Sequence, residues 1–117
     1  QLKGFIPIIA HIERCIDFYH HFDRLIKWVD RGIELQLTVG TLNGLFGREA
    51  LQFARKSLQE GLVTYLMSDA HGLSKFGRKP TLSDGIQKVA KIIGQEAAMA
   101  LVTNNPANIL ENQLKLK

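Results

Sequence analysis

Cysteine and long apolar runs are scarce in this 117-residue sequence, and each shortage excludes a class of protein. Cys15 is the one cysteine, so a disulfide framework is impossible and a reducing, cytoplasmic location is expected. No apolar run approaches the roughly 20 residues that a membrane-spanning helix needs. The first ten residues lack the charged start and long apolar stretch of a signal peptide. The sequence begins at Gln1 without a methionine, and we expect a fragment or a processed chain.

Strong charge of either sign is also lacking. The sequence has 15 Lys and Arg against 11 Asp and Glu, a net charge of +4. Apolar residues make up 45% and charged residues 22%, which is a globular composition. The basic residues are dispersed and form no basic helix interleaved with aromatic residues, so a nucleic-acid partner is not expected. The mild positive charge favours anionic ligands.

Hydrophobic periodicity predicts strands that alternate with helices. The predicted strands span 5–10, 33–39 and 62–67; the predicted helices span 17–31, 48–60, 81–93 and 95–102, with a short last helix at 105–110. Asp17 is expected to cap the first helix and Gly32 to end it. Asn105 and Pro106 are expected to be the cap and first residue of the last helix. Residues 40–47 hold three glycines and predict a loop.

The alternation of strands and helices predicts the α/β class, with parallel strands and helical crossovers. Three parallel strands make a poor free-standing domain, because a parallel sheet needs both faces covered. The pattern therefore fits part of a β/α barrel better than a complete small fold. The alternative is an open three-stranded α/β sandwich that stands alone or as a dimer.

Polar residues follow each predicted strand, where β/α barrels place their active sites. Asp69 and His71 come directly after the third strand, and residues two apart in an extended segment point the same way. A carboxylate and an imidazole could therefore meet one divalent ion such as Mn, Fe or Zn. The alternative is an aspartate that caps the following turn, with the histidine hydrogen-bonded beside it.

The end of the first strand and the loop after the third strand carry further candidates. His11 has the same placement as Asp69, and Arg14 could bind phosphate oxygens through its guanidinium fork. The alternatives are a structural histidine and a surface ion pair between Arg14 and a neighbouring acid, Glu13 or Asp17. Arg78 and Lys79 could form a basic lid over an anion, or simply a solvated loop.

Two common hydrolytic mechanisms do not match the sequence. A cysteine phosphatase needs an arginine six positions after the cysteine, but His21 stands six after Cys15 in a stretch predicted to be helical. Cys15 is therefore expected to be a small buried apolar residue. The serine-hydrolase motif G-x-S-x-G is absent. His20 and His21 are adjacent on a predicted helix, point apart, and cannot chelate one ion together.

Five short segments occur in order along the chain: PIIAHIER (7–14), QLTVGTLNGLFG (36–47), LMSDAH (66–71), GRKP (77–80) and NNP (104–106). The first three resemble the segments PIIAHPER, QINAGSLTGRFG and IASDAH of a known family. The last two resemble its basic-proline loop and the NNP before its last helix. That family is the bacterial protein-tyrosine phosphatases of the PHP superfamily, found in capsule and exopolysaccharide gene clusters. The resemblance is to the C-terminal part of their domain and covers nearly all of residues 1–117.

The resemblance implies a distorted TIM-like (PHP) barrel and metal-dependent hydrolysis of phosphotyrosine. It implies His11, Asp69 and His71 as metal ligands, with Mn as the metal and Fe, Zn or Mg as alternatives. It implies that Arg14 and Arg78 hold the phosphate and that a metal-bound hydroxide attacks phosphorus. The implied partner is a bacterial tyrosine kinase of polysaccharide export.

The sequence also departs from the family pattern. Ile12 stands where the family usually has proline, and Leu45 stands where it often has arginine. The family's N-terminal His-x-His segment and its intermediate carboxylate ligands are missing from this sequence. We therefore expect an incomplete metal site in this chain, and self-association through uncovered strand edges and apolar faces. Two alternatives stay open: a histidinol-phosphatase-like phosphoesterase, and a truncated, non-catalytic binding module.

Overall fold

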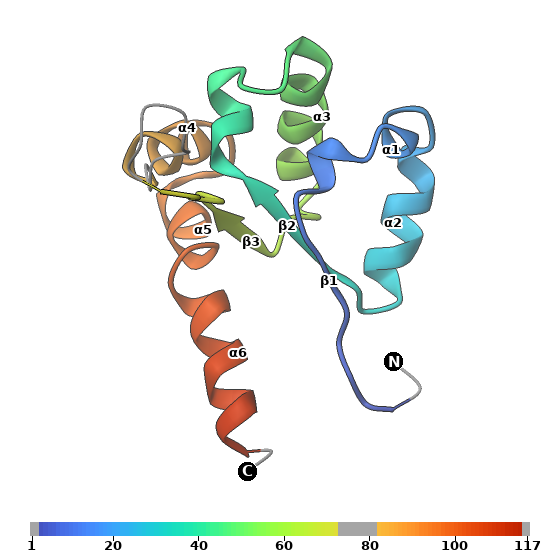
Figure 1. Cartoon of the computed structure of the whole chain (residues 1–117), viewed down its shortest axis with the longest axis vertical. Helices are drawn as coiled ribbons and strands as arrows, with labels where there is room; N and C mark the ends of the chain where they lie inside the picture. Colours follow the sequence, from blue (N-terminus) through green and yellow to red (C-terminus); the bar gives the residue numbers. More distant parts are fainter. Residues whose placement is uncertain (1–2, 73–81, 116–117) are drawn as a thin grey trace.

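The structure is a computed structural model that describes residues 3–72 and 82–115 (Figure 1). Its elements are β1 (Ile8–Ile9), η1 (Ile12–Arg14), α1 (Asp17–His20), α2 (Phe22–Asp30), β2 (Glu34–Thr38), η2 (Val39–Asn43), α3 (Arg48–Gln59), β3 (Tyr65–Met67), α4 (Ser83–Ile93), α5 (Gln95–Ala100) and α6 (Asn104–Lys115). Within the described residues, no helix has the length and apolarity that a membrane crossing requires.

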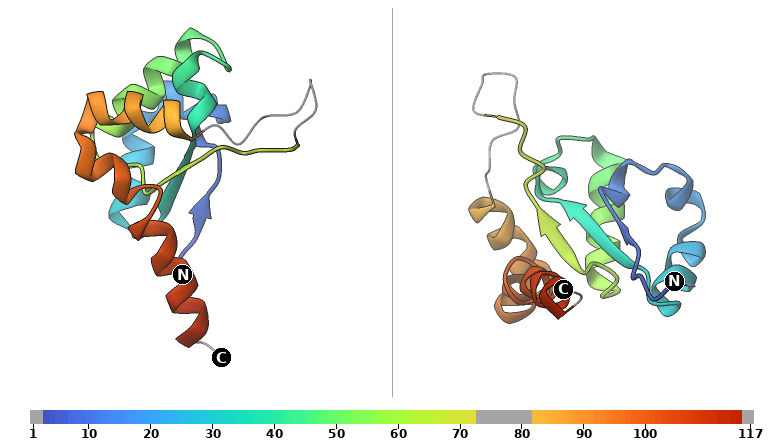
Figure 2. Two further views of the ribbon diagram at one scale, coloured as in Figure 1. Left: turned by 90° about the vertical axis from the view of Figure 1, so that its left-hand side faces the viewer. Right: turned by 60° about the horizontal axis from the view of Figure 1, so that its bottom comes forward.

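The three strands form one parallel sheet in the order β1-β2-β3, which confirms the predicted α/β class with parallel strands. In the register, Ile9 pairs with Leu35, and Leu37 pairs with Leu66. Helices α2, α3 and α4 gather on one face of this sheet (Figure 2). The described residues form an open sheet, so the barrel expected from the sequence stays a prediction.

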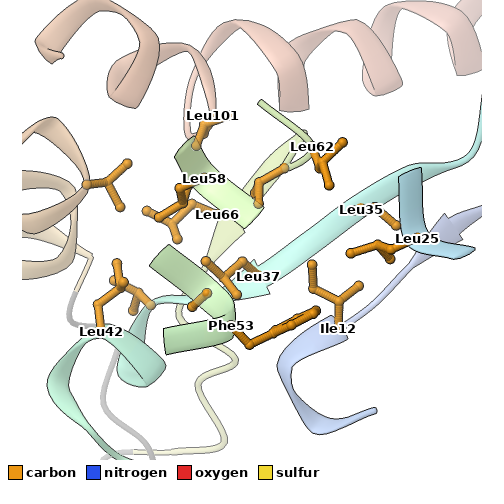
Figure 3. Packing of buried hydrophobic residues seen from close by; sticks show 14 of the residues in the cluster. Ile12, Leu25, Leu35, Leu37, Leu42, Phe53, Leu58, Leu62, Leu66 and Leu101 are labelled. Carbon is orange, nitrogen blue, oxygen red and sulfur yellow. The ribbon is translucent and has the colours of Figure 1, made fainter. Parts of the chain in front are cut away.

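The core lies between the sheet and these helices. Leu35 and Leu37 are fully buried, and Figure 3 shows Leu37 beside Leu66, Phe53 and Leu58. Because side chains alternate along a strand, the apolar residues of β2 all face the helices. Burial of a leucine side chain stabilises a fold by about 1.5–3 kcal/mol, so this face supplies much of the driving force for folding.

The predicted first helix, 17–31, is wrong in one respect: it is two helices, broken at His21 (φ −127°, ψ 53°). The break serves the packing of the aromatic rings, since Phe18 packs edge-on against Trp28 while Phe22 packs against Phe53. Asp17 does not cap the helix as predicted. Its carboxylate lies 2.8 Å from the guanidinium of Arg24, across the break.

Other element boundaries also differ from those predicted. The first strand is shorter than predicted, and the loop predicted at 40–47 begins with the 3-10 turn η2. Asn105 is not a helix cap: it lies inside α6, and its side-chain Nδ2 donates to the backbone oxygen of Thr64 at 2.8 Å. The backbone N–H of Leu66 also donates to Leu101 at 3.1 Å. These two bonds attach the C-terminal segment to the outer edge of β3.

Candidate active site

Three segments leave the carboxyl ends of the parallel strands at one edge of the sheet (Figure 1). Segment η1 follows β1, η2 follows β2, and the stretch from Ser68 to His71 follows β3. The predicted site residues His11, Arg14, Asp69 and His71 all lie on these segments. The strand topology thus places them at the edge where β/α proteins build their active sites.

His11 and Asp69 share an unusual backbone conformation. They are the non-glycine residues with positive φ in the described chain, at 39° for His11 and 50° for Asp69. The left-handed region is unfavourable for residues that carry a Cβ, and such strain tends to gather at functional sites. The two residues that bend the chain at the ends of β1 and β3 are therefore two of the predicted metal ligands.

Asp69 and His71 lie close together. The His71 Nδ1 is 2.7 Å from the backbone oxygen of Asp69 and 3.8 Å from its carboxylate Oδ1. Asp69 has a left-handed backbone and not the extended conformation assumed from the sequence, and the two side chains still lie on the same side of the segment, close to each other. The Asp69 side chain is 25% exposed and the His71 side chain 65% exposed. Asp69 also lines a hollow of about 380 Å³ with Gln36 and Met67.

Arg14 connects the first two strand ends. Its guanidinium carbon lies 5.7 Å from the ring centroid of Phe46, in the loop that follows η2. The acids proposed as its alternative partners are engaged elsewhere, because Asp17 pairs with Arg24 and Glu13 is buried. The Arg14 side chain is exposed at the edge of the sheet, where a phosphate could reach it.

The described donors do not complete a metal centre. In residues 3–72 and 82–115 no group of three or more His, Cys, Asp or Glu side chains is arranged to hold an ion. The Asp69–His71 pair has the right donor chemistry for a divalent metal and could supply part of such a site. His11 is at the same edge of the sheet but does not join the pair in a three-ligand group. Arg78 and Lys79 lie outside the described residues.

Four buried polar residues near this edge were not among the site residues predicted from the sequence: Glu13, Gln36, Thr38 and Thr41. Each has one buried side-chain atom without a hydrogen-bond partner in the described part of the chain, namely Glu13 Oε1, Gln36 Nε2, Thr38 Oγ1 and Thr41 Oγ1. The alternation of 34–38 could have signalled Gln36 and Thr38, since polar residues alternate there with Leu35 and Leu37. Glu13 gave no such signal.

Glu13 makes two contacts across the site. Its carboxylate Oε2 accepts a bond from the backbone N–H of Thr38 at 3.3 Å, and its backbone oxygen accepts one from the Tyr19 hydroxyl. Burial raises the pKa of Tyr19, and the negative charge of Glu13 raises it further. Tyr19 therefore stays protonated and can donate to the turn that carries Arg14.

The cysteine and the adjacent histidines can be placed as well. Cys15 is exposed, so the prediction that it is buried was wrong. It is the residue that ends η1. His20 and His21 are exposed near the break between α1 and α2. The Nε2 of His21 lies 4.0 Å from the carboxylate of Asp17.

Comparison with known proteins points to one group. A family model described as "Capsular polysaccharide synthesis, CpsB/CapC" matches residues 1–111. The chain is 33% identical over 113 residues to the tyrosine-protein phosphatase YwqE of Bacillus subtilis, covering 97% of this chain and 43% of YwqE. It is 30% identical over 116 residues to the tyrosine-protein phosphatase CpsB of Streptococcus agalactiae, covering 95% of this chain and 47% of that protein.

The fold agrees with these sequence matches. The structure superimposes on one solved structure with a TM-score of 0.80 and 31% sequence identity. That structure belongs to a set of crystal structures of YwqE from Bacillus subtilis and CpsB from Streptococcus pneumoniae, which are described as "unique metal-dependent tyrosine phosphatases". The match covers 91% of this chain and 42% of that one. The chain thus spans less than half the length of the relatives that it matches.

Proposed function

Since this chain belongs to the CpsB/CapC family of capsular polysaccharide synthesis, we propose that the protein carrying it is a metal-dependent protein-tyrosine phosphatase. The observation that carries the proposal is the shared edge of the sheet. There, two strained residues, His11 and Asp69, lie at the ends of β1 and β3, with His71 and Arg14 close to them in the chain. Imidazole, carboxylate and guanidinium groups are those that bind a divalent ion and a phosphate.

In this proposal His11, Asp69 and His71 contribute metal ligands, and Arg14 and Arg78 hold the phosphate. The metal is manganese, with iron, zinc or magnesium as alternatives. When bound, a divalent ion polarises the phosphoryl oxygens of the substrate. Further ligands must come from outside the described residues, because these contain no three-ligand group.

The proposal extends to fold and setting. Residues 1–117 would be the C-terminal portion of a distorted TIM-like PHP barrel, which the parallel sheet with helices on one face and the shorter length of the chain support. The substrate would be a phosphotyrosine protein, a tyrosine kinase of polysaccharide export, in the cytoplasm. Self-association stays a prediction: Phe5, Ile6 and Ile8 are exposed, and sedimentation as a monomer at high concentration would contradict it.

The activity is tested with the complete protein on three substrates: a phosphotyrosine peptide, a phosphoserine peptide and small phosphoesters such as histidinol phosphate. We expect the highest kcat/KM on phosphotyrosine. Preference for histidinol phosphate would support the histidinol-phosphatase-like alternative. Inactivity on all three, with metal bound, would contradict the enzyme and favour a binding module.

The metal site is tested by mass spectrometry of the complete protein purified without chelator. We expect a stoichiometric divalent ion in the wild type and its loss in Asp69→Ala. The matched control is Asp23→Ala, since Asp23 is an exposed carboxylate of α2 that pairs with Lys27. Equal metal content in Asp69→Ala and the wild type would remove Asp69 from the ligand set.

A further inference from the structure

The parallel ladder between β1 and β2 stops one step before the site. The register pairs Ile9 with Leu35, and continuing it would place His11 opposite Leu37. In a regular parallel ladder, the N–H of His11 would then donate to the backbone oxygen of Gln36. The N–H of Thr38 would donate to the backbone oxygen of His11, four residues on from the observed bond between Glu34 and Pro7.

In the structure, both of these N–H groups donate to side chains and not to backbone oxygens. The N–H of His11 donates to the side-chain Oε1 of Gln36 at 2.7 Å, and the N–H of Thr38 donates to the carboxylate Oε2 of Glu13 at 3.3 Å. The backbone oxygen of His11 turns away and accepts from the N–H of Arg14 at 3.0 Å, inside η1. Two side-chain acceptors therefore replace the two backbone acceptors that a longer β1 would have supplied.

This exchange explains how His11 can hold its left-handed backbone (φ 39°, ψ 57°). Without the two side chains, bending the chain at His11 would leave the N–H groups of His11 and Thr38 without acceptors, and an unsatisfied buried N–H is unfavourable. With them, the bend satisfies the same donors as an extended strand. The chain can then leave β1 at His11 and present His11 and Arg14 at the edge of the sheet.

The burial of the Glu13 and Gln36 side chains is itself energetically unfavourable. Both are nearly completely buried, and one side-chain atom of each, Glu13 Oε1 and Gln36 Nε2, has no partner in the described part of the chain. Apolar side chains of similar size would be easier to bury at both positions. The two hydrogen bonds to the strand ends are what these polar side chains supply here and apolar ones could not.

We propose that Glu13 and Gln36 are positioning residues, which replace the missing ladder acceptors and thereby hold His11 and Arg14 in place for phosphate-ester hydrolysis. The role in hydrolysis rests on the proposed function. The role in holding the turn does not, because it follows from the hydrogen bonds alone.

The kinetic test uses the complete protein and pairs of substitutions that keep or remove the acceptor. Glu13→Gln and Gln36→Glu keep a side-chain oxygen, while Glu13→Leu and Gln36→Leu keep the size and lose the acceptor. Substitutions of residues that orient ligands lower activity by about 10- to 100-fold, and we expect a loss of that size in kcat for the leucine variants with little change in KM. The variants that keep the acceptor should recover most of the loss.

Ser57→Ala is the matched control for lost stability. Ser57 is fully buried in α3, and its hydroxyl donates to the backbone oxygen of Phe53 at 2.9 Å. A leucine variant that shares its Tm with Ser57→Ala should still have the lower kcat. If the two have equal kcat at equal Tm, Glu13 and Gln36 are only structural and the positioning role is wrong.

A second measurement is independent of catalysis. The ¹³Cα shift of His11 and the hydrogen exchange of the Thr38 amide report the turn and the replaced bond directly. We expect Glu13→Leu to speed exchange at Thr38, and either leucine variant to move the His11 shift away from its left-handed value. An unchanged His11 shift in both variants would overturn the proposal. If the His11 shift moves in the leucine variants but the wild-type protein has no phosphatase activity, the turn-holding role is supported and the proposed function is rejected.

Discussion

The two faces of the small parallel sheet have opposite compositions. On β2, Leu35 and Leu37 face the helices and belong to the buried core, whereas Gln36 and Thr38 alternate with them and face the other way. Both faces are buried at these positions, but the polar side chains keep atoms that have no partner in the described residues. Burial on the first face therefore stabilises the fold, and burial on the second opposes it.

This difference suggests a division of work along one strand. The apolar face gains free energy from removing surface from water, which needs no exact partner. The polar face loses free energy unless each group finds a hydrogen bond, and here Gln36 finds one through the N–H of His11. Proteins retain such unfavourable groups mainly where function requires them. Substitutions on the two faces should therefore have different consequences.

The largest effect is expected from Leu37→Ala. Leu37 is fully buried beside Leu66 and α3, and truncating such a leucine costs about 2–5 kcal/mol through lost burial and the cavity left behind. Urea unfolding followed by circular dichroism measures the loss. If Leu37→Ala cost no more than a substitution at Thr38, the contrast between the faces would fail.

The next effect is expected from Gly85→Ala in α4. A Cβ on Gly85 would clash with Cγ2 of Val39, which is buried in the core directly after β2. Overpacking of this kind costs about 1–3 kcal/mol, and we expect a loss of free energy of unfolding in that range. Adding Val39→Ala makes room, so the double variant should be less destabilised than the sum of the two single variants. Simple additivity would show that the two residues do not meet.

A smaller effect is expected on the polar face from Tyr65→Phe. The Tyr65 hydroxyl donates to the Glu34 carboxylate at 2.5 Å, and burial, followed by this hydrogen bond, raises the pKa of Tyr65 to about 12. Because Tyr65→Phe loses this hydrogen bond, we expect its free energy of unfolding at neutral pH to fall by about 0.5–1.5 kcal/mol.

The same tyrosine predicts a pH dependence. In the unfolded chain its pKa is about 10, so between pH 10 and 12 the folded state binds more protons than the unfolded state. Its contribution to stability is therefore complete below pH 10 and is lost as the pH rises to about 12. Tyr65→Phe should weaken the fall in stability over this window, measured by urea unfolding at several pH values. An identical fall in both proteins would rule out Tyr65 as its source.

The smallest effect is expected from Thr38→Val, one residue along from Leu37. The Thr38 hydroxyl is buried without a partner in the described residues, so replacing it by a methyl group removes an unsatisfied polar atom. We expect a change in the free energy of unfolding within about 1 kcal/mol, and in the stabilising direction. A loss as large as that of Leu37→Ala would show that this hydroxyl is bonded and that the polar face is stabilising after all.

The core could be predicted well from the sequence, and the ends of elements less well. The periodic apolar residues of 48–60 and 33–39 predicted α3 and β2 to within two residues, since burial of a face depends on local spacing. The break at His21 could not be predicted, because it depends on Phe22 reaching Phe53, some thirty residues away. Local pattern does not encode such a contact.

The site divides in the same way. By itself, the sequence determined which chemical groups follow the strands, because Asp69, His71, His11 and Arg14 come directly after the ends of apolar runs. Only the tertiary structure decided how they are held. The left-handed turn at His11 depends on hydrogen bonds between residues 25 positions apart, from His11 to Gln36 and from Thr38 to Glu13. Such bonds exist only once β1 and β2 lie side by side, and no spacing along the chain can show them in advance.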